Sequence, residues 1–269
     1  MKAIISHDID LLTVWEHKND LAIPKLIVRS SIELAIGSIY STEYLLRFKE
    51  LVENKLHNLE ELMEFDKEKK VPSTFFIGVN KGLGLSYSLT DAEYWIKRIM
   101  EKGFDVGVHG IEFNDLKAIK TEYESFKQMS GLSAFGIRMH YLRNSKNTLE
   151  FLNKAGYIFD SSLYKKERPF KAGNLWEFPL HIMDTYIFNE NSRWQNRTLD
   201  QAKDKTKAIM EGIHKWGIKY FTILCHDRHF SNSFRSWKAW YIWTVEYLKK
   251  NRVELTTYKE AIQELKKKA

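Results

Sequence analysis

Short apolar runs alternate with amphipathic stretches along most of the chain. The apolar runs are rich in β-branched and aromatic residues and are bounded by polar or glycine-containing segments, a pattern typical of buried strands. We expect strands at residues 3–6, 73–79, 105–108, 134–139, 157–159, 176–180, 220–225 and 253–256.

The stretches between these strands carry apolar residues at helical spacing. Residues 43–65 predict one long amphipathic helix. Thr90-Asp91 and Gly103 mark the ends of another helix through Met100. Further helices are expected at 115–129, 146–154, 199–216, 237–249 and from 259 onward.

Strands and helices alternate without a repeat or a flexible linker, so we expect a single α/β domain over residues 1–269. The alternation predicts a parallel sheet, either closed as a barrel or doubly wound. No Gly-x-Gly-x-x-Gly follows a predicted strand and there is no Walker loop, which disfavours a nucleotide-binding open sheet.

Reactive side chains stand at the ends of several predicted strands. In a (β/α) barrel these ends meet on one face, so we expect the side chains to share a rim around a cation-sized gap. Taken singly, an Asp-x-Asp pair, a buried histidine and a buried arginine each have ordinary structural explanations. Only their convergence predicts a site. The residues are Asp8 and Asp10, His109, Arg138 and His140, and His226.

Composition and charge narrow the class of protein. The chain has 269 residues, 43% hydrophobic and 14% aromatic, which predicts a folded core. The net charge of +7 is spread along the chain, which favours solvated helix ends over a nucleic-acid surface. One cysteine, Cys225, excludes an intrachain disulfide and agrees with a reducing compartment. With no signal-peptide pattern and no membrane-spanning run, we expect a cytoplasmic protein.

Six segments of the chain resemble, in order, the motifs of the polysaccharide deacetylase family (carbohydrate esterase family four, NodB-like). Within that family, the chain resembles the short, unsecreted WbmS-like proteins of O-antigen and capsule clusters. The segments are residues 6–10, 73–77, 107–110, 136–138, 159–163 and 223–226. The resemblance implies a distorted (β/α) barrel with about seven parallel strands.

The resemblance also implies roles for individual residues. Asp8 would be the general base and His226 the general acid, while Arg138 would orient Asp8 and keep it ionised. Asp10 and His109 would bind a divalent metal, with zinc favoured. The activity implied is that of a carbohydrate N-deacetylase, a hydrolase of carbon–nitrogen bonds other than peptide bonds.

One position departs from the family pattern. The second metal histidine of the family, four residues after the first, is replaced by Phe113, which cannot bind a metal. Catalytic zinc normally has three protein ligands, so another residue must complete the site or the site is empty. His140 is the first substitute, followed by Glu112 and His7. His140 could instead contact sugar hydroxyls.

The expected substrate is a glycan or a nucleotide- or lipid-linked sugar of surface-polysaccharide synthesis. Aromatic and polar side chains would bind it, namely Tyr141, Trp176 and Glu177, with Trp194 and Trp237 as further stacking surfaces. Three alternatives stay open. They are a catalytically degenerate carbohydrate-binding protein, a hydrolase of cyclic amides on the same scaffold, and a glycosyltransferase that uses Asp8-Ile9-Asp10 as its metal motif.

Overall fold

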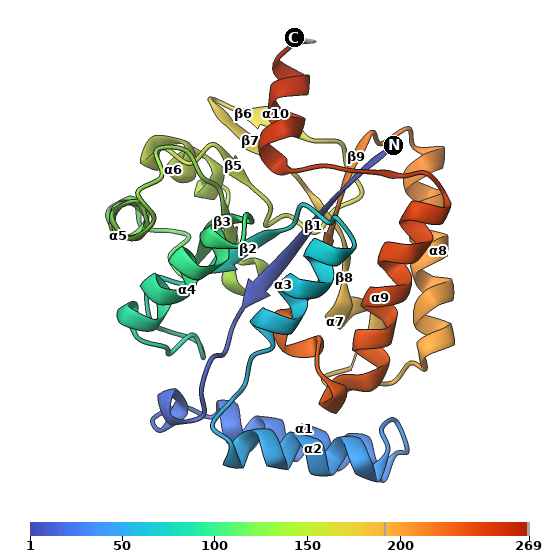
Figure 1. Cartoon of the computed structure of the whole chain (residues 1–269). Helices are drawn as coiled ribbons and strands as arrows, with labels where there is room; N and C mark the ends of the chain where they lie inside the picture. The colour runs from blue at the N-terminus through green and yellow to red at the C-terminus, as the bar shows by residue number, and fades with distance from the viewer. Residues whose placement is uncertain (191, 268–269) are drawn as a thin grey trace.

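A ten-stranded sheet forms the centre of the molecule (Figure 1). The computed structural model describes residues 1–190 and 192–267. The strand order is β6-β7-β5-β4-β3-β2-β1-β9-β8, and β10 also pairs with β1. The strands are β1 (Lys2–Ile9), β2 (Thr74–Ile77), β3 (Asp105–Gly110), β4 (Ile137–Met139), β5 (Phe159–Asp160), β6 (Phe170–Ala172), β7 (Leu175–Glu177), β8 (Leu180–Met183), β9 (Tyr220–Leu224) and β10 (Glu254–Leu255).

The sheet is curled into a distorted barrel, as the family resemblance implies. All strand pairs are parallel except β6 with β7. Strand β7 pairs with β5 and β8 pairs with β9, yet only Phe178 and Pro179 separate β7 from β8. The chain therefore draws the two ends of the parallel run together. A bridge between Tyr164 and Leu180 adds a further link across this gap.

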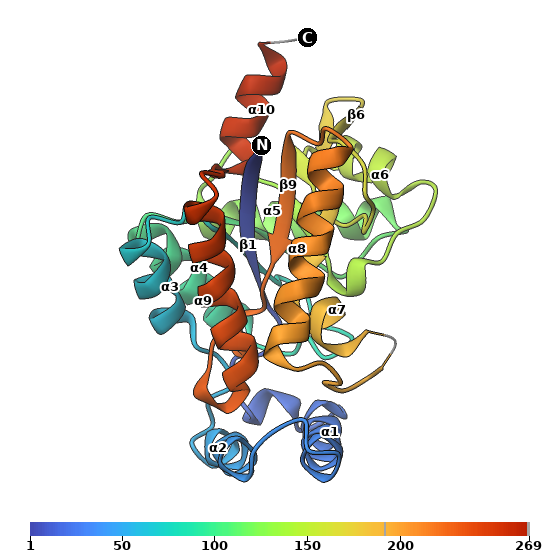
Figure 2. The ribbon, with the colours of Figure 1, turned by 90° about the vertical axis from the view of Figure 1, so that its right-hand side faces the viewer.

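Helices surround the sheet on its outer side. In Figure 2, α8 and α9 stand beside β9 and β1, while α10 lies near the amino end of β1. The helices are α1 (Ala22–Ala35), α2 (Ser41–Val52), α3 (Leu59–Glu68), α4 (Leu89–Glu101), α5 (Leu116–Ser130), α6 (Thr148–Ala155), α7 (Asp184–Asn189), α8 (Leu199–Lys215), α9 (Arg235–Lys250) and α10 (Tyr258–Lys266), with single 3-10 turns η1 (Trp15–His17), η2 (His140–Leu142), η3 (Asp227–His229) and η4 (Asn232–Phe234). None of these helices is long and apolar enough to cross a membrane.

The two faces of β1 explain how the core is divided. Successive side chains of a strand point to opposite faces. Ala3 and Ile5 join the large apolar cluster between the sheet and the helices. Ile4 belongs to a second cluster, which also contains Phe76, Phe159 and Tyr258 and fills the inside of the curled sheet. Ser6 and Asp8 have the same parity as Ile4, so this strand carries a polar layer beyond the apolar filling.

Helices α1 and α2 form a hairpin that lies beyond the carboxyl end of β1 (Figure 1). A buried ion pair joins them, with Arg47 Nη1 2.5 Å from Glu33 Oε2. Arg47 Nε also donates to the Ser233 carbonyl oxygen at 2.9 Å, and Gln195 N donates to Glu33 Oε1 at 2.7 Å. The hairpin is thus attached to the loops that follow β8 and β9.

The structure corrects the prediction for this region. The helix expected over 43–65 is two helices, α2 and α3, and Asn54 between them has a left-handed backbone with φ of 56°. Helix α1 was not predicted. The apolar stripe was misleading because Leu45 and Val52 are exposed, while the buried residues of α2 are Glu43 and Arg47.

Candidate metal centre and active site

Three side chains from three strand ends converge on one point. Asp10 follows β1, His109 lies in β3, and His140 follows β4. His109 Nε2 is 3.1 Å from Asp10 Oδ1 and 3.0 Å from His140 Nδ1, and His140 Nδ1 is 3.2 Å from Asp10 Oδ1. These residues could hold a metal ion. The separations are close to the edge of about 3.4 Å in a tetrahedron with zinc–ligand bonds near 2.1 Å.

The contacts of the remaining ring nitrogen of each histidine determine which nitrogen faces the centre of the cluster. His109 Nδ1 contacts the Arg138 carbonyl oxygen at 3.1 Å, and His140 Nε2 contacts the Leu83 carbonyl oxygen at 3.2 Å. A carbonyl oxygen only accepts, so these nitrogens carry the protons of the neutral rings. His109 Nε2 and His140 Nδ1 then turn lone pairs toward the Asp10 carboxylate. Metal-binding histidines typically donate their other ring N–H group to a carbonyl oxygen or a carboxylate in this way.

The electrostatics of this cluster favour a positive charge at its centre. Burial by itself lowers the pKa of His140, but the Asp10 carboxylate outweighs burial and raises it. Burial also raises the pKa of Asp10, but His140 and His109 outweigh it and hold that pKa well below its usual range. The donor set of one carboxylate and two imidazoles fits a divalent cation of the zinc type.

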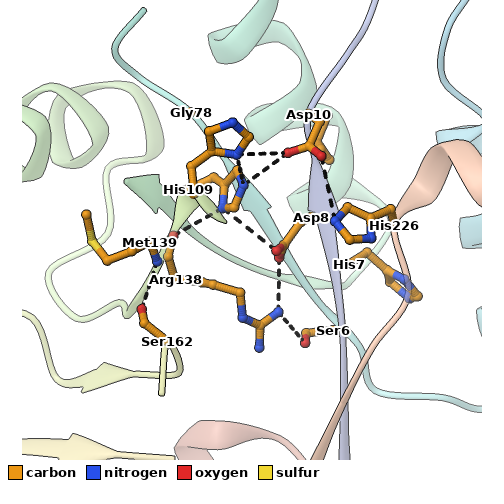
Figure 3. A network of polar contacts seen from close by, with 12 residues as sticks. Ser6, His7, Asp8, Asp10, Gly78, His109, Arg138, Met139, Ser162 and His226 are labelled. Atoms are coloured by element: carbon orange, nitrogen blue, oxygen red, sulfur yellow. Dashed lines mark hydrogen bonds and ion pairs between the residues drawn. The ribbon is translucent and has the colours of Figure 1, made fainter. Parts of the chain in front are cut away.

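Arg138 holds Asp8 in place inside the barrel (Figure 3). Arg138 is fully buried, and each of its five N–H groups has an acceptor. Nη1 donates to Asp8 Oδ1 at 3.0 Å and to Ser6 Oγ at 2.8 Å. Nε and Nη2 donate to Ser161 O and Oγ, and Nη2 also to the Tyr258 hydroxyl. The ion pair with Arg138 fixes the position of the Asp8 carboxylate.

His226, directly after β9, is held by Asp184, the first residue of α7. Asp184 Oδ1 accepts from His226 Nδ1 at 2.8 Å, and Asp184 Oδ2 accepts from His226 N at 2.8 Å and from His229 Nδ1 at 2.7 Å. His226 Nε2 is left 3.6 Å from Asp10 Oδ2. Burial lowers the pKa of His226, but the Asp184 carboxylate outweighs it and raises the pKa to about 10. The Asp184 carboxylate thus favours the protonated form of His226, and Nε2 of the ring faces the cluster.

A cavity of about 450 Å³ opens onto these groups. This volume lies within the range of small-molecule sites. The cluster, Asp8 and His226 all line this cavity, and so does Tyr141, whose ring centre lies 4.1 Å from that of His140. The cavity is lined by Asp8, Asp10, Lys25, Arg29, Leu83, His109, His140, Tyr141, Tyr186, His226, Asp227, Arg228 and further residues of the same loops.

Two residues expected to bind the substrate lie elsewhere. Trp176 and Glu177, on β7, are buried and are not among the residues that line the cavity. Glu177 lies opposite Asp160 in the pairing of β7 with β5. Burial, and to a lesser extent the charge of Asp160, raises the pKa of Glu177 well above its usual range. Trp194 and Trp237 are also absent from the lining, and Trp237 is fully buried against Phe188.

The two lower-ranked ligand substitutes are also placed away from the cluster. His7 faces the outer layer, where its ring contacts the Cys225 carbonyl oxygen at 2.8 Å and Asp66 Oδ2 at 3.0 Å. Glu112 does not line the cavity. Phe113 packs against the apolar core, with the Arg143 guanidinium 4.8 Å from its ring centre. His140 is therefore the substitute that the fold brings to Asp10 and His109.

Sequence reasoning did not assign a role to Asp184 or to the cavity-lining Arg29 and Arg228. Asp184 lies four residues beyond the end of the predicted strand at 176–180, so the strand-end pattern missed it. The structure places β8 at Leu180–Met183, and Asp184 is then a strand-end residue like the others.

No protein-family model and no curated protein matches the sequence. Solved structures match the fold. A protein assigned as a polysaccharide deacetylase from Mycobacterium smegmatis has a TM-score of 0.67 at 14% identity, covering 99% of this chain and 90% of that one. The allantoinase PuuE has a TM-score of 0.62 at 12% identity, covering 96% of this chain and 87% of that one. A protein assigned as a polysaccharide deacetylase from Pseudomonas aeruginosa PAO1 gives 0.61 at 12%, covering 96% and 88%. The chain has the polysaccharide deacetylase fold.

Proposed function

We propose that this protein is a metal-dependent hydrolase that removes an N-acetyl or other N-acyl group from a sugar in surface-polysaccharide synthesis. The observation that carries the proposal is the convergence of Asp10, His109 and His140 on one point, with Asp8 and His226 beside them in one cavity. The fold of the similar structures supports it, and the resemblance to the O-antigen and capsule branch suggests the pathway.

Asp10, His109 and His140 would hold the metal. A divalent ion of the zinc type, when bound there, would act as a Lewis acid and would lower the pKa of water bound to it. Asp8 accepts the proton of the attacking water on its carboxylate, which Arg138 holds in place. His226 donates the Nε2 proton to the departing amine nitrogen, while Asp184 keeps the imidazole oriented through Nδ1. Tyr141 offers an exposed ring for stacking on the sugar.

The test is release of acetate from N-acetylated sugars by the zinc-loaded protein and by Asp8→Asn. We expect Asp8→Asn to bind zinc normally and to lose at least about 100-fold in kcat, because general-base catalysis contributes about that much. Equal release by both proteins would exclude Asp8 as the base. Glycan binding without any turnover by the zinc-loaded wild type would instead favour a catalytically degenerate carbohydrate-binding protein.

The allantoinase similarity makes hydrolysis of a cyclic amide the second candidate function. The same base, acid and metal ligands would serve, because ring opening also breaks a carbon–nitrogen bond. Assaying allantoin and other cyclic amides beside the N-acetylated sugars separates the two, since ring opening consumes water without releasing acetate.

A further inference from the structure

One arginine of the cavity lining packs on an aromatic ring, 5.3 Å from the ring centre of Phe234, but its terminal nitrogens have no acceptor among the described residues. Arg228, in η3 just after the proposed acid His226, is only 8% exposed and lines the cavity. Its Nη1 and Nη2 atoms are buried and make no hydrogen bond to any residue in the described ranges. In Arg138, in contrast, every N–H group of the guanidinium has an acceptor. A buried guanidinium without acceptors is unfavourable, and such groups are usually satisfied by a partner.

Two further cations line the same cavity. Lys25 and Arg29 lie one turn apart on α1, so both side chains stand on one face of the helix. Lys25 is exposed and makes no ion pair within residues 1–190 and 192–267. Arg29 Nε binds Glu33 Oε1 at 2.8 Å, but its buried Nη2 makes no hydrogen bond to a described residue.

The nearby acids do not neutralise Arg228. Burial lowers the pKa of Arg228, and Glu50 and then Asp227 are the acidic groups that oppose this lowering most. Glu50 Oε1 accepts from Ser231 Oγ at 2.5 Å, and Asp227 Oδ2 accepts from Asn58 N at 3.3 Å. Neither carboxylate forms an ion pair with Arg228 in the described part of the chain. Burial raises the pKa of Asp227 to about 7, which reduces its negative charge near neutral pH.

We propose that Arg228, Arg29 and Lys25 form a subsite for a phosphate group, so that the substrate of the neighbouring centre is a phosphorylated sugar. Guanidinium groups bind phosphate oxygens with charge-assisted, often paired hydrogen bonds, and a third cation suits the double charge of a phosphate. The cavity of about 450 Å³ has room for a sugar phosphate that reaches from these cations to the metal ligands. That the bound molecule is an acylated sugar rests on the proposed function. Phosphate binding by these three cations does not depend on catalysis.

Calorimetric titration of the full chain in the presence of a chelator tests the subsite, because chelation prevents the anion from binding a metal. The probes are inorganic phosphate, N-acetylglucosamine 1-phosphate, N-acetylglucosamine and glucuronate. We expect saturable binding of both phosphate probes and at least tenfold weaker binding of the other two. Arg228→Gln should weaken phosphate binding at least tenfold and Arg29→Gln several-fold. Arg168→Gln, an exposed arginine outside the cavity lining, is the matched control and should bind as the wild type does.

Thermal unfolding provides the second readout. Arg228→Gln removes an unpaired buried charge, so its Tm should equal or exceed that of the wild type. Phosphate should raise the Tm of the wild type and of Arg168→Gln but not that of Arg228→Gln. If Arg228→Gln does not fold, the Lys25→Gln/Arg29→Gln double variant should show the same loss of phosphate binding. The proposal is overturned if wild type does not bind phosphate, if the variants bind it as well as wild type, or if glucuronate binds equally tightly. Phosphate binding and Tm can be measured whether or not the protein releases acetate. Failure of acetate release would therefore count against the proposed function alone.

Discussion

At the residue scale, the turn after β4 carries backbone strain next to the site. Tyr141 and Leu142 both have left-handed backbones, with φ of 57° and 52°, and neither is a glycine. A non-glycine residue in this region costs about 1 kcal/mol or more. The turn places His140 at the metal cluster and Tyr141 on the cavity wall. Strain of this kind is often retained where it positions functional side chains.

The strain at Tyr141 can be measured by comparing two truncations. Tyr141→Gly and Tyr141→Ala both remove the ring, but only glycine adopts a φ of 57° without steric strain. We expect the glycine variant to be more stable than the alanine variant by about 1 kcal/mol in urea unfolding. Equal stability, or a more stable alanine variant, would show that this backbone is not strained. Both variants should bind glycans more weakly than the wild type.

The third metal ligand is a second residue-scale prediction. His140→Ala should lower zinc affinity by about 100-fold or more, because removing even an outer-shell partner of a metal ligand costs about 10- to 100-fold. Competition with a chromophoric chelator measures this affinity. The control is His214→Ala, which removes an exposed histidine on α8. Unchanged zinc affinity in His140→Ala would mean that another residue completes the site.

At the element scale, parallel strands bring together most of the side chains that the sequence singled out. A strand and the residue after it can be read from a short segment, and parallel pairing then brings Asp8, His109 and Arg138 together. The α1–α2 hairpin could not be read in this way. Its buried face carries Glu43 and Arg47, whose partners include Arg235 N and Ser233 O, distant in sequence. Local hydrophobic spacing contains no information on such contacts.

Helix α5 supplies a buried carboxyl group that makes stability depend on pH. Glu122 Oε1 accepts from Asn80 Nδ2 and from the backbone N–H groups of Ile111 and Glu112. Burial nevertheless raises the pKa of Glu122 to about 7 from 4.5. The folded state therefore keeps a proton that the unfolded state releases, so this carboxyl lowers stability as pH rises from about 4.5 to about 7, with no further change above.

Glu122→Gln should remove this dependence. Relative to wild type, the variant should gain stability between pH 4.5 and pH 7.5 by up to about 3 kcal/mol, the free energy that corresponds to the pKa difference. Urea unfolding at a series of pH values measures the gain. Glu124→Gln, an exposed change on the same helix, should show no such trend. A constant difference between Glu122→Gln and wild type across this range would contradict the prediction.

At the scale of the whole molecule, the proposed metal ties three strand ends together and should stabilise the folded chain. A ligand that binds only the folded state at 100 times its Kd contributes about 2.7 kcal/mol. For a chain of this length, that corresponds to a Tm increase of about 5 °C.

Zinc addition and chelation should therefore move the Tm of the wild type in opposite directions. Asp10→Asn, which weakens the charge of the ligand set, should show a much smaller change between the two conditions. Differential scanning fluorimetry with metal analysis of the same samples provides the measurement. A Tm that does not respond to zinc in a wild type shown to contain one equivalent would contradict a metal that links these strands.

The position of β1 has a consequence for how the chain acquires its shape during synthesis. Strand β1 pairs with β2 on one side and with β9 on the other, and Lys2 lies opposite Tyr220 in that second pairing. The ribosome makes the partner strand some 218 residues later, roughly 10–45 s at ordinary elongation rates. Throughout that interval the β9 side of the strand that bears Asp8 has no partner. Nascent chains arrested before residue 220 should accordingly depend on a chaperone to avoid aggregation.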